Sequence, residues 1–157
     1  MTDLEKAVEQ DTAAILEVHN GWNKSNLGLV AESMLPFFPE GDGYLQFNLN
    51  GFTYRGKADK AKLWRNLRAV GVDIVRLEEK EPPTIQVFGD VALLTSEAEA
   101  ELVMPTPTGK LESGGTTHFR NTEFYRRDDG LGNPEWRIWH MHVSEAAPEG
   151  ALKYGTE

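Results

Sequence analysis

Two histidines near the carboxyl end of the chain, His140 and His142, are the first candidates for chemistry. The alternation from Trp136 to Ser144 predicts a β-strand that carries both imidazoles on one face, with Trp136 and Ile138. An imidazole titrates near neutral pH, so either His could act as general acid or base; a hydrogen-bonded structural role is the alternative. The pair could also chelate a divalent metal, but two ligands are too few for a tight site, so no metal is predicted.

Arg120 and Thr122 share one face of the preceding predicted strand, His118 to Arg126. If that face is concave, the Arg120 guanidinium can hold a carboxylate or enolate oxygen in bidentate fashion. A salt bridge to the glutamates between residues 97 and 101 is the competing role. Glu123 has the opposite parity, so only one of Arg120 and Glu123 can point into a pocket.

Aromatic residues and one amide could line an apolar pocket around these groups. The candidates are Trp22, Tyr44, Phe47, Asn48, Tyr54 and Trp64, with Thr122 as a further lining residue. Ligand pockets commonly set a few polar groups among aromatic walls, although such residues more often fill a core.

The elements that would position these residues follow from apolar periodicity. Leu4, Val8, Ile15, Val18 and Trp22 recur at helical spacing and predict a first helix from about Thr2 or Asp3 to about Lys24. A short helix near residues 29–35, a hairpin of strands 44–48 and 52–55, and a helix over 57–70 follow. Strands are predicted at 73–79, 84–88, 91–104, 118–126 and 136–144, with 105–115 as a loop. This order predicts an α+β fold with a curved antiparallel sheet.

The strand predicted from Val91 to Met104 has two unlike faces. Small and apolar residues from Ala92 to Leu102 alternate with a row of acids, Glu97, Glu99 and Glu101. Small residues on the concave side would leave room for a cavity. The acids would then lie on the outer face, where Arg120, Arg126, Arg127 or Arg137 could neutralise them.

The last predicted strand is apolar on both faces, because Trp139, Met141 and Val143 lie opposite Trp136 and Ile138. A strand of this kind commonly covers a core with one face and a partner sheet with the other. The sequence therefore predicts a homodimer.

Over about Leu4 to Ser144 the chain resembles the nuclear transport factor 2-like superfamily. The resemblance lies in the order of elements and in the motifs of the last two predicted strands, R-x-T-x-x-Y-x-R and W-R-I-x-H-x-H-x-S. The SnoaL-like branch and the association domain of calcium/calmodulin-dependent protein kinase are the most similar. The resemblance implies a cone-shaped, cystatin-like roll: a strongly bent sheet wrapped on the first helices, a pocket between them, and dimerisation through the outer sheet face. The superfamily includes isomerases, dehydratases, cyclases, hydrolases and association domains, so the resemblance indicates a fold rather than an activity.

Ketosteroid isomerase-like members take a carboxylate base from about the strand that here reads Tyr44-Leu45-Gln46-Phe47-Asn48. They hold the oxyanion with a later acid and a Tyr of the first helix. Here that strand has no acid and the first helix ends in Trp22. Steroid-type isomerisation is therefore not expected.

Composition limits the partners and the location. The 157 residues predict one domain over residues 1–145 and a weakly ordered tail over 146–157. A net charge of −9 disfavours nucleic acid and anionic membranes. The absence of Cys excludes disulfides and thiolate metal sites, no cofactor is predicted, and the acidic N-terminus, unlike a signal peptide, favours a cytoplasmic protein.

Two functions stay open. The leading hypothesis is a SnoaL-like homodimer that binds a small organic molecule and acts as a cofactor-free isomerase, cyclase or dehydratase. His140 or His142 would then be the general acid or base and Arg120 the anion stabiliser. The alternative is a non-catalytic ligand-binding or association module, in which the same polar residues only satisfy one another's hydrogen bonds and charges.

Overall fold

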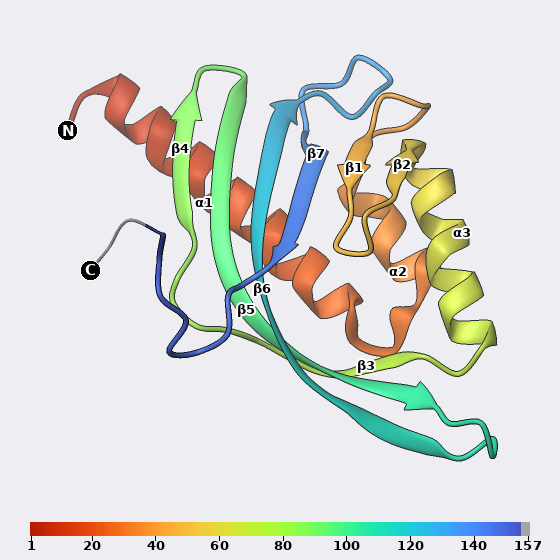
Figure 1. Cartoon of the computed structure of the whole chain (residues 1–157). Helices are drawn as coiled ribbons and strands as arrows, with labels where there is room; N and C mark the ends of the chain where they lie inside the picture. The colour runs from red at the N-terminus through yellow and green to blue at the C-terminus, as the bar shows by residue number, and fades with distance from the viewer. Residues whose placement is uncertain (155–157) are drawn as a thin grey trace.

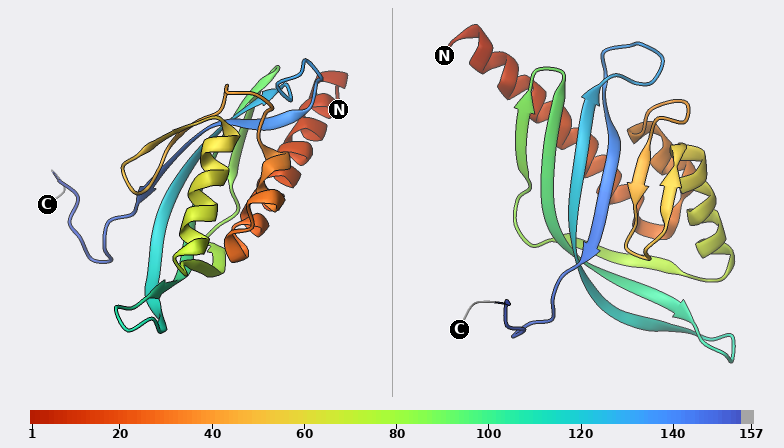
Figure 2. Two further views of the ribbon diagram at one scale, coloured as in Figure 1. Left: turned by 90° about the vertical axis from the view of Figure 1, so that its right-hand side faces the viewer. Right: turned by 45° about the horizontal axis from the view of Figure 1, so that its top comes forward.

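The helices lie on the inner side of a strongly bent sheet in the computed structural model, which describes residues 1–154 (Figures 1 and 2). The helical elements are α1 (Asp3–Ser25), η1 (Leu27–Leu29), α2 (Ala31–Met34), η2 (Leu35–Phe37) and α3 (Gly56–Ala69). The strands are β1 (Leu45–Phe47), β2 (Thr53–Arg55), β3 (Asp73–Glu79), β4 (Thr84–Phe88), β5 (Val91–Pro105), β6 (Leu111–Arg127) and β7 (Trp136–Glu145). The predicted α+β architecture and element order are confirmed.

Helix α1 begins with a capping box. The Thr2 hydroxyl accepts a hydrogen bond from the Glu5 amide at 3.1 Å, and the Glu5 carboxylate accepts one from the Thr2 amide at 2.6 Å. The first turns project beyond the sheet, so Leu4 stays 75% exposed. Only the second half of the apolar stripe, from Ile15 to Trp22, contributes to the core.

The sheet runs in the order β2-β1-β7-β6-β5-β3, and β4 also pairs with β5. β1 is parallel to β7, and all the other pairs are antiparallel. β3 and β4 occupy successive stretches of one edge of β5, opposite residues 98–103 and 91–95. This arrangement lets the long β5–β6 ribbon curve around the helices, as Figure 1 shows.

The prediction of a loop from Pro105 to Gly115 is wrong, because β6 begins at Leu111 and pairs with the end of β5. A Gly-Gly pair such as Gly114-Gly115 is typical of a turn. Here the two glycines lie opposite Leu102, at a register shift between two paired stretches of β5 and β6. Gly115 has a φ of +81°, a conformation that glycine adopts without strain. Two glycines in a strand can therefore mark a bulge instead of its end.

The alternation of β7 is interrupted by a second register shift. Phe124 pairs with His140 while its neighbour Tyr125 pairs with Ile138, so Trp139 is an extra residue. Beyond it the parity inverts, and Met141 shares the core with Trp136 and Ile138. The prediction that both histidines share a face with Trp136 and Ile138 is wrong for this reason.

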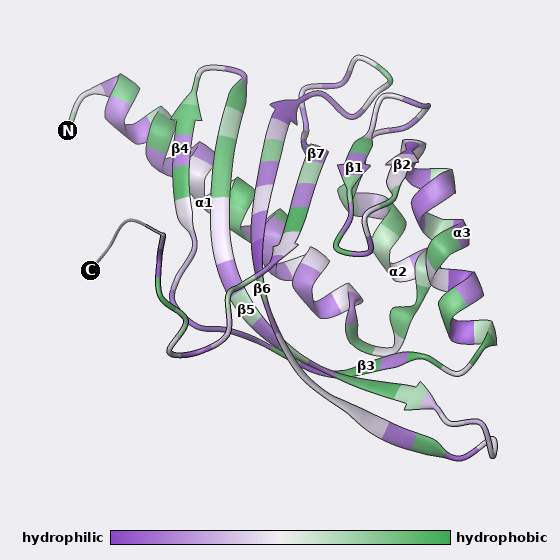
Figure 3. Ribbon diagram, viewed as in Figure 1, coloured by the Kyte–Doolittle hydropathy of each residue, from purple (hydrophilic) through white to green (hydrophobic). Residues whose placement is uncertain are grey.

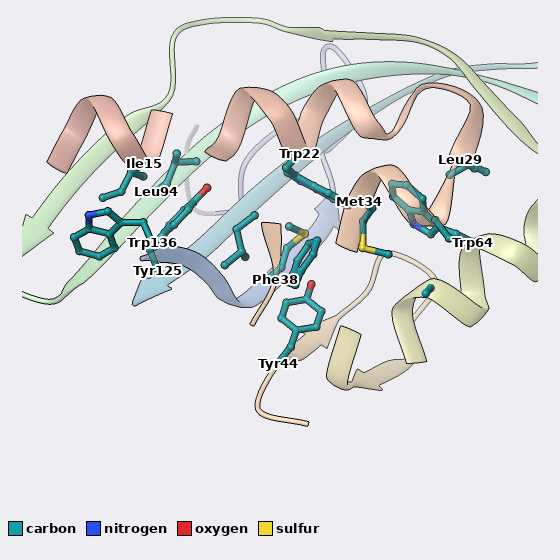
Figure 4. Packing of buried hydrophobic residues seen from close by; sticks show 14 of the residues in the cluster. Ile15, Trp22, Leu29, Met34, Phe38, Tyr44, Trp64, Leu94, Tyr125 and Trp136 are labelled. Atoms are coloured by element: carbon teal, nitrogen blue, oxygen red, sulfur yellow. The ribbon is translucent and has the colours of Figure 1, made fainter. Parts of the chain in front are cut away.

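The core lies between α1, the segments around α2, α3 and the inner face of the sheet. Hydrophilic and hydrophobic residues alternate along β6 and β7, as expected for strands with one inward face (Figure 3). Ile15, Leu94, Tyr125 and Trp136 gather at one end of the core, and an aromatic cluster gathers at the other (Figure 4).

The acids of β5 lie on the outer face, as predicted, but their partners differ from the predicted arginines. Glu97 lies 3.6 Å from His118, Glu99 lies 3.6 Å from Lys80, and Glu101 lies 3.6 Å from Arg76. The partners come from the strands and segments on either side of β5, because side chains on one sheet face meet across the ladder.

The polypeptide after β7 forms no helix or strand in residues 146–154, and residues 155–157 of the predicted tail lie outside the described part. The division into a domain over 1–145 and a tail stays a prediction. No helix within residues 1–154 is long and apolar enough to cross a membrane.

Candidate functional site

A pocket of about 180 Å³ opens between the helices and the concave face of the sheet. Its walls are mostly apolar, with amides and one amine among them. The lining residues are Trp22, Asn23, Asn26, Leu29, Gln46, Asn48, Leu49, Lys60, Leu63, Trp64, Leu67, Ile74, Leu77, Ser96, Ala98, Ala100, Leu102, Thr117, Phe119, Asn121, Met141 and Val143. An apolar cavity of about 150 Å³ can hold a benzene, so this pocket suits a molecule of about one ring.

Small side chains on β5 create the space. Ser96, Ala98 and Ala100 line the pocket, and each faces the helices across the bent sheet. Longer side chains at these positions would fill the cavity. The prediction of small residues on the concave face of this strand is confirmed.

Lys60 is the most unusual residue of the pocket, because it is only 2% exposed. It lies on the buried face of α3, one turn before Trp64, and its Nζ lies 4.2 Å from the centre of the Trp22 ring. Phe38, Tyr44 and Trp64 complete an aromatic box around the amine, at 5.3, 5.8 and 5.9 Å from their ring centres. Figure 4 shows these four rings gathered from α1, the segment after α2, and α3.

Burial lowers the pKa of Lys60 to about 7, although the nearby negative charge of Glu123 partly opposes the shift. The ammonium form loses its hydration in the pocket, and no ion pair with a carboxylate replaces it in residues 1–154. The amine can therefore hold or release a proton near neutral pH.

A short chain of hydrogen bonds fixes the amine. Gln46 Oε1 accepts from Lys60 Nζ and, at 2.7 Å, from the Tyr44 hydroxyl. Gln46 Nε2 donates to Asn48 Oδ1 at 2.7 Å. On the sheet side, Asn121 is 6% exposed and its Oδ1 has no partner among the described residues. A buried acceptor of this kind fits a donor supplied by a bound molecule.

A second buried polar cluster lies beneath the pocket, where His19 joins two carboxylates. His19 Nδ1 donates to Glu123 Oε2 at 2.6 Å, and His19 Nε2 donates to Glu79 Oε1. Burial alone would lower the pKa of His19, but the hydrogen bonds and charges of Glu123 and Glu79 outweigh it and raise the pKa to about 9. The Tyr125 hydroxyl lies 3.4 Å from Glu123, and Asn23, a pocket residue, donates to Glu79 at 2.9 Å.

These groups can perform acid–base chemistry. Lys60 can exchange a proton with a bound molecule, Tyr44 and Gln46 can hold the amine in place, and Asn121 offers an acceptor. The charged cluster of His19, Glu79 and Glu123 sets the local potential without lining the pocket itself.

The residues predicted from the sequence fall into two groups, one at the concave pocket and one on the outer face of the sheet. Trp22, Asn48 and Trp64 line the concave pocket, and Tyr44 lies under it in the aromatic box. Tyr54 and Phe47 are not among the pocket residues within 1–154; the Tyr54 hydroxyl accepts from Asn50 at 2.9 Å.

Arg120, Thr122 and His142 come together on the outer face of the sheet. They line a polar depression with Ser144 and Glu97, and Arg120 donates to Ser144 Oγ at 3.0 Å. His140 Nδ1 donates to the Leu45 carbonyl at 2.8 Å, and Phe47 packs edge-on against both imidazoles. No third His, Asp or Glu completes a metal site with them in the described residues. Their catalytic role stays a prediction.

Lys60 and His19 were not among the candidate residues predicted from the sequence. A signal for each was present, because Lys60 precedes Trp64 by four residues and His19 lies between Ile15 and Trp22 at helical spacing. A charged residue on an apolar helix stripe is a candidate for a buried functional group.

The bent sheet, the helices on its inner side and the pocket between them define a small α+β roll built around a cavity. A family model described as a SnoaL-like domain matches residues 41–148, which is more than half of the sequence. The chain belongs to the SnoaL-like domain family. A comparison with curated proteins finds no match.

Solved structures similar to this chain carry the nuclear transport factor 2-like fold. A superfamily protein from Salmonella enterica is 21% identical, with a TM-score of 0.74 over 97% of this chain and 99% of that one. A protein from Streptomyces avermitilis, provisionally named a dehydratase, is 13% identical, with a TM-score of 0.64 over 89% and 99%. A provisionally named calcium/calmodulin-dependent kinase II association domain from Exiguobacterium sibiricum is 10% identical, with a TM-score of 0.64 over 88% and 95%. These likenesses show the fold alone.

Proposed function

We propose that the protein binds a small organic molecule with an apolar body and one carbonyl group in the concave pocket, and transfers a proton on it without a cofactor. The observation that carries the proposal is the buried Lys60 amine at a pocket walled by Trp22 and Trp64. Lys60 is the proton acceptor and donor, in place of the histidines that the sequence predicted.

The composition of the pocket supports a neutral, ring-sized ligand. Trp22 and Trp64 are stacked with ring centres 5.4 Å apart, and the rest of the wall is largely aliphatic. A ligand anion would meet the same desolvating environment that disfavours the ammonium form of Lys60, and the negative charge of nearby Glu123 would repel it. A neutral carbonyl can accept a hydrogen bond from Lys60 at no such cost.

Ligand binding can be measured from the fluorescence of Trp22 and Trp64. We expect small cyclic ketones and enones to change the emission in a saturable way. Replacing Ala98 by Leu fills the pocket, so the variant should bind at least about tenfold more weakly, equivalent to about 1.4 kcal/mol. Thermal unfolding of the variant checks that it still folds.

A matched pair of variants separates the concave pocket from the outer face. Arg120→Gln and His142→Gln alter the outer depression and should leave the binding of these ligands unchanged. Loss of binding in these two variants, with Ala98→Leu unaffected, would move the site to the outer face and restore the sequence-based assignment.

We further propose that the chain forms a homodimer through the outer sheet face. Phe47 is 42% exposed there and lies 5.2 Å from His140 and 5.6 Å from His142, measured between ring centres. The Arg126 guanidinium stacks on Trp139 at 3.9 Å on neighbouring strands. Aromatic and Arg side chains are enriched in protein interfaces. An association module without catalysis would use the same face and leave the pocket empty of substrate.

A further inference from the structure

We propose that Lys60 forms an imine with an aldehyde or ketone bound in the concave pocket, so that its amine is a nucleophile toward the carbonyl carbon. The inference rests on the proposed function and deepens it by naming the bond that the ligand makes. It requires an amine that is held without a counter-charge and that faces the space in which the ligand lies.

Lys60 differs from Lys57 and Lys80 in its partners. Lys57 pairs with Glu40, and Lys80 pairs with Glu99 at 3.6 Å, so each ammonium is compensated by a carboxylate. The Lys60 amine instead meets the amide oxygen of Gln46 and the faces of aromatic rings. An amide oxygen accepts one N–H and leaves the nitrogen lone pair free whenever the amine is neutral.

Desolvation supplies that neutral amine. Burial lowers the pKa of Lys60 to about 7, so a substantial fraction of the amine is unprotonated near neutral pH. An ordinary exposed lysine, with a pKa near 10.4, has roughly a thousandfold less free amine at this pH. A lysine desolvated in an apolar pocket is one of the recognised ways to make an activated nucleophile.

The reaction balances without another reagent. The amine adds to the carbonyl carbon and gives a carbinolamine, and loss of the hydroxyl forms the C=N bond. The two hydrogens of the neutral amine leave with the carbonyl oxygen as one water molecule. Asn121 Oδ1, a buried acceptor without a partner in residues 1–154, fits the hydroxyl of the carbinolamine. The Tyr44 hydroxyl, whose pKa burial raises well above 10, keeps its proton and its bond to Gln46.

Size and polarity restrict the carbonyl compound. A cavity of about 180 Å³ admits one ring, and the walls offer the stacked faces of Trp22 and Trp64. The substrate class is therefore a neutral aldehyde or ketone on a compact apolar or aromatic body. Benzaldehyde is a suitable probe because it has both features.

Reductive trapping tests the inference on the full chain. The protein is incubated with benzaldehyde at pH 7, cyanoborohydride is added, and the benzylated lysines are located by peptide mass spectrometry. We expect one benzyl group at Lys60, formed at least about a hundredfold faster than at any exposed lysine, given the larger free-amine fraction. Lys60→Met should lose the adduct, while Lys57→Met and Lys62→Met should keep it, and Ala98→Leu should slow it.

Binding of toluene, which has no carbonyl, separates the two proposals. Saturable toluene and benzaldehyde binding without a preferred adduct at Lys60 would overturn the imine and leave the binding function standing. Absence of binding by both, with adducts spread over surface lysines, would overturn the proposed function as well. If Lys60→Met does not fold, the site and rate of labelling in the wild-type protein and in Ala98→Leu still decide the question.

Discussion

Lys60 and His19 are both buried, yet burial and neighbours move their pKa values in opposite directions. The pKa of His19 is raised to about 9 from 6.5, so its contribution to stability is full below pH 6.5 and is lost as the pH rises to 9. The pKa of Lys60 is lowered to about 7 from 10.5, so the unfolded state binds more protons between pH 7 and 10.5 and stability rises there. The two effects oppose each other between pH 7 and 9.

We expect the free energy of unfolding to change little between pH 7 and 9 in the wild-type protein. In Lys60→Met only the His19 effect remains. The free energy of unfolding should then fall by up to about 1.4 kcal/mol per pH unit as the pH rises from 7 to 9. Urea unfolding at a series of pH values measures both slopes. A flat profile in Lys60→Met would contradict the protonated state assigned to His19.

Removing His19 leaves Glu123 buried without its main partner. Loss of one member of a buried ion pair commonly costs about 3–5 kcal/mol, and we expect this from His19→Leu. The double variant His19→Leu, Glu123→Leu removes both charges and should recover more than half of the loss. Urea unfolding of the two variants tests this; equal losses would show that the pair is not coupled.

At the scale of elements, the loop between β6 and β7 is held against the segment before β1. The Glu40 amide donates to the Asp129 carbonyl at 2.7 Å, and a Cβ on Gly130 would lie 2.3 Å from the Glu40 carbonyl oxygen. Gly132 has a similar positive φ, +87° against +90°, but a Cβ there meets nothing within 4 Å. The two positions differ in packing and share the same backbone strain.

Gly132→Ala should therefore cost about 1–2 kcal/mol from the backbone conformation alone. Gly130→Ala should cost at least about 1 kcal/mol more, because the backbone of residue 40 must move. The midpoint of thermal unfolding measures the difference. Equal midpoints would mean that the loop does not depend on this contact.

At the scale of the whole molecule, the two proposals use opposite faces of the sheet, the outer face for the dimer and the concave face for ligand binding. Phe47→Glu places a charge among the rings of His140 and His142, and we expect it to convert the proposed dimer to a monomer. Light scattering coupled to gel filtration measures the mass. Ligand binding by the monomer should persist, because Phe47 does not line the pocket; a monomeric wild-type protein would refute the dimer.

The periodicity of the sequence predicted the element order, the faces of β5 and the buried second half of the α1 stripe correctly, because one face of each element must be buried and apolar residues recur at the spacing of that face. It did not decide which face of β6 is concave, and the predicted pocket residues Arg120 and Thr122 lie on the outer face. The anionic outer face of β5 and its small inner face are examples. The endings of β6 and β7 also identified the fold family.

Only the tertiary structure decided which polar residues meet. The extra residue Trp139 in β7 inverts the parity after it and places His142 on the outer face, an event that no local pattern marks. Lys60, Gln46 and Asn121 come from α3, β1 and β6, and His19, Glu79 and Glu123 from α1, β3 and β6. The chain itself determined its elements through local spacing, whereas the sites arise where residues distant in sequence are desolvated together, and that desolvation exists only in the folded protein.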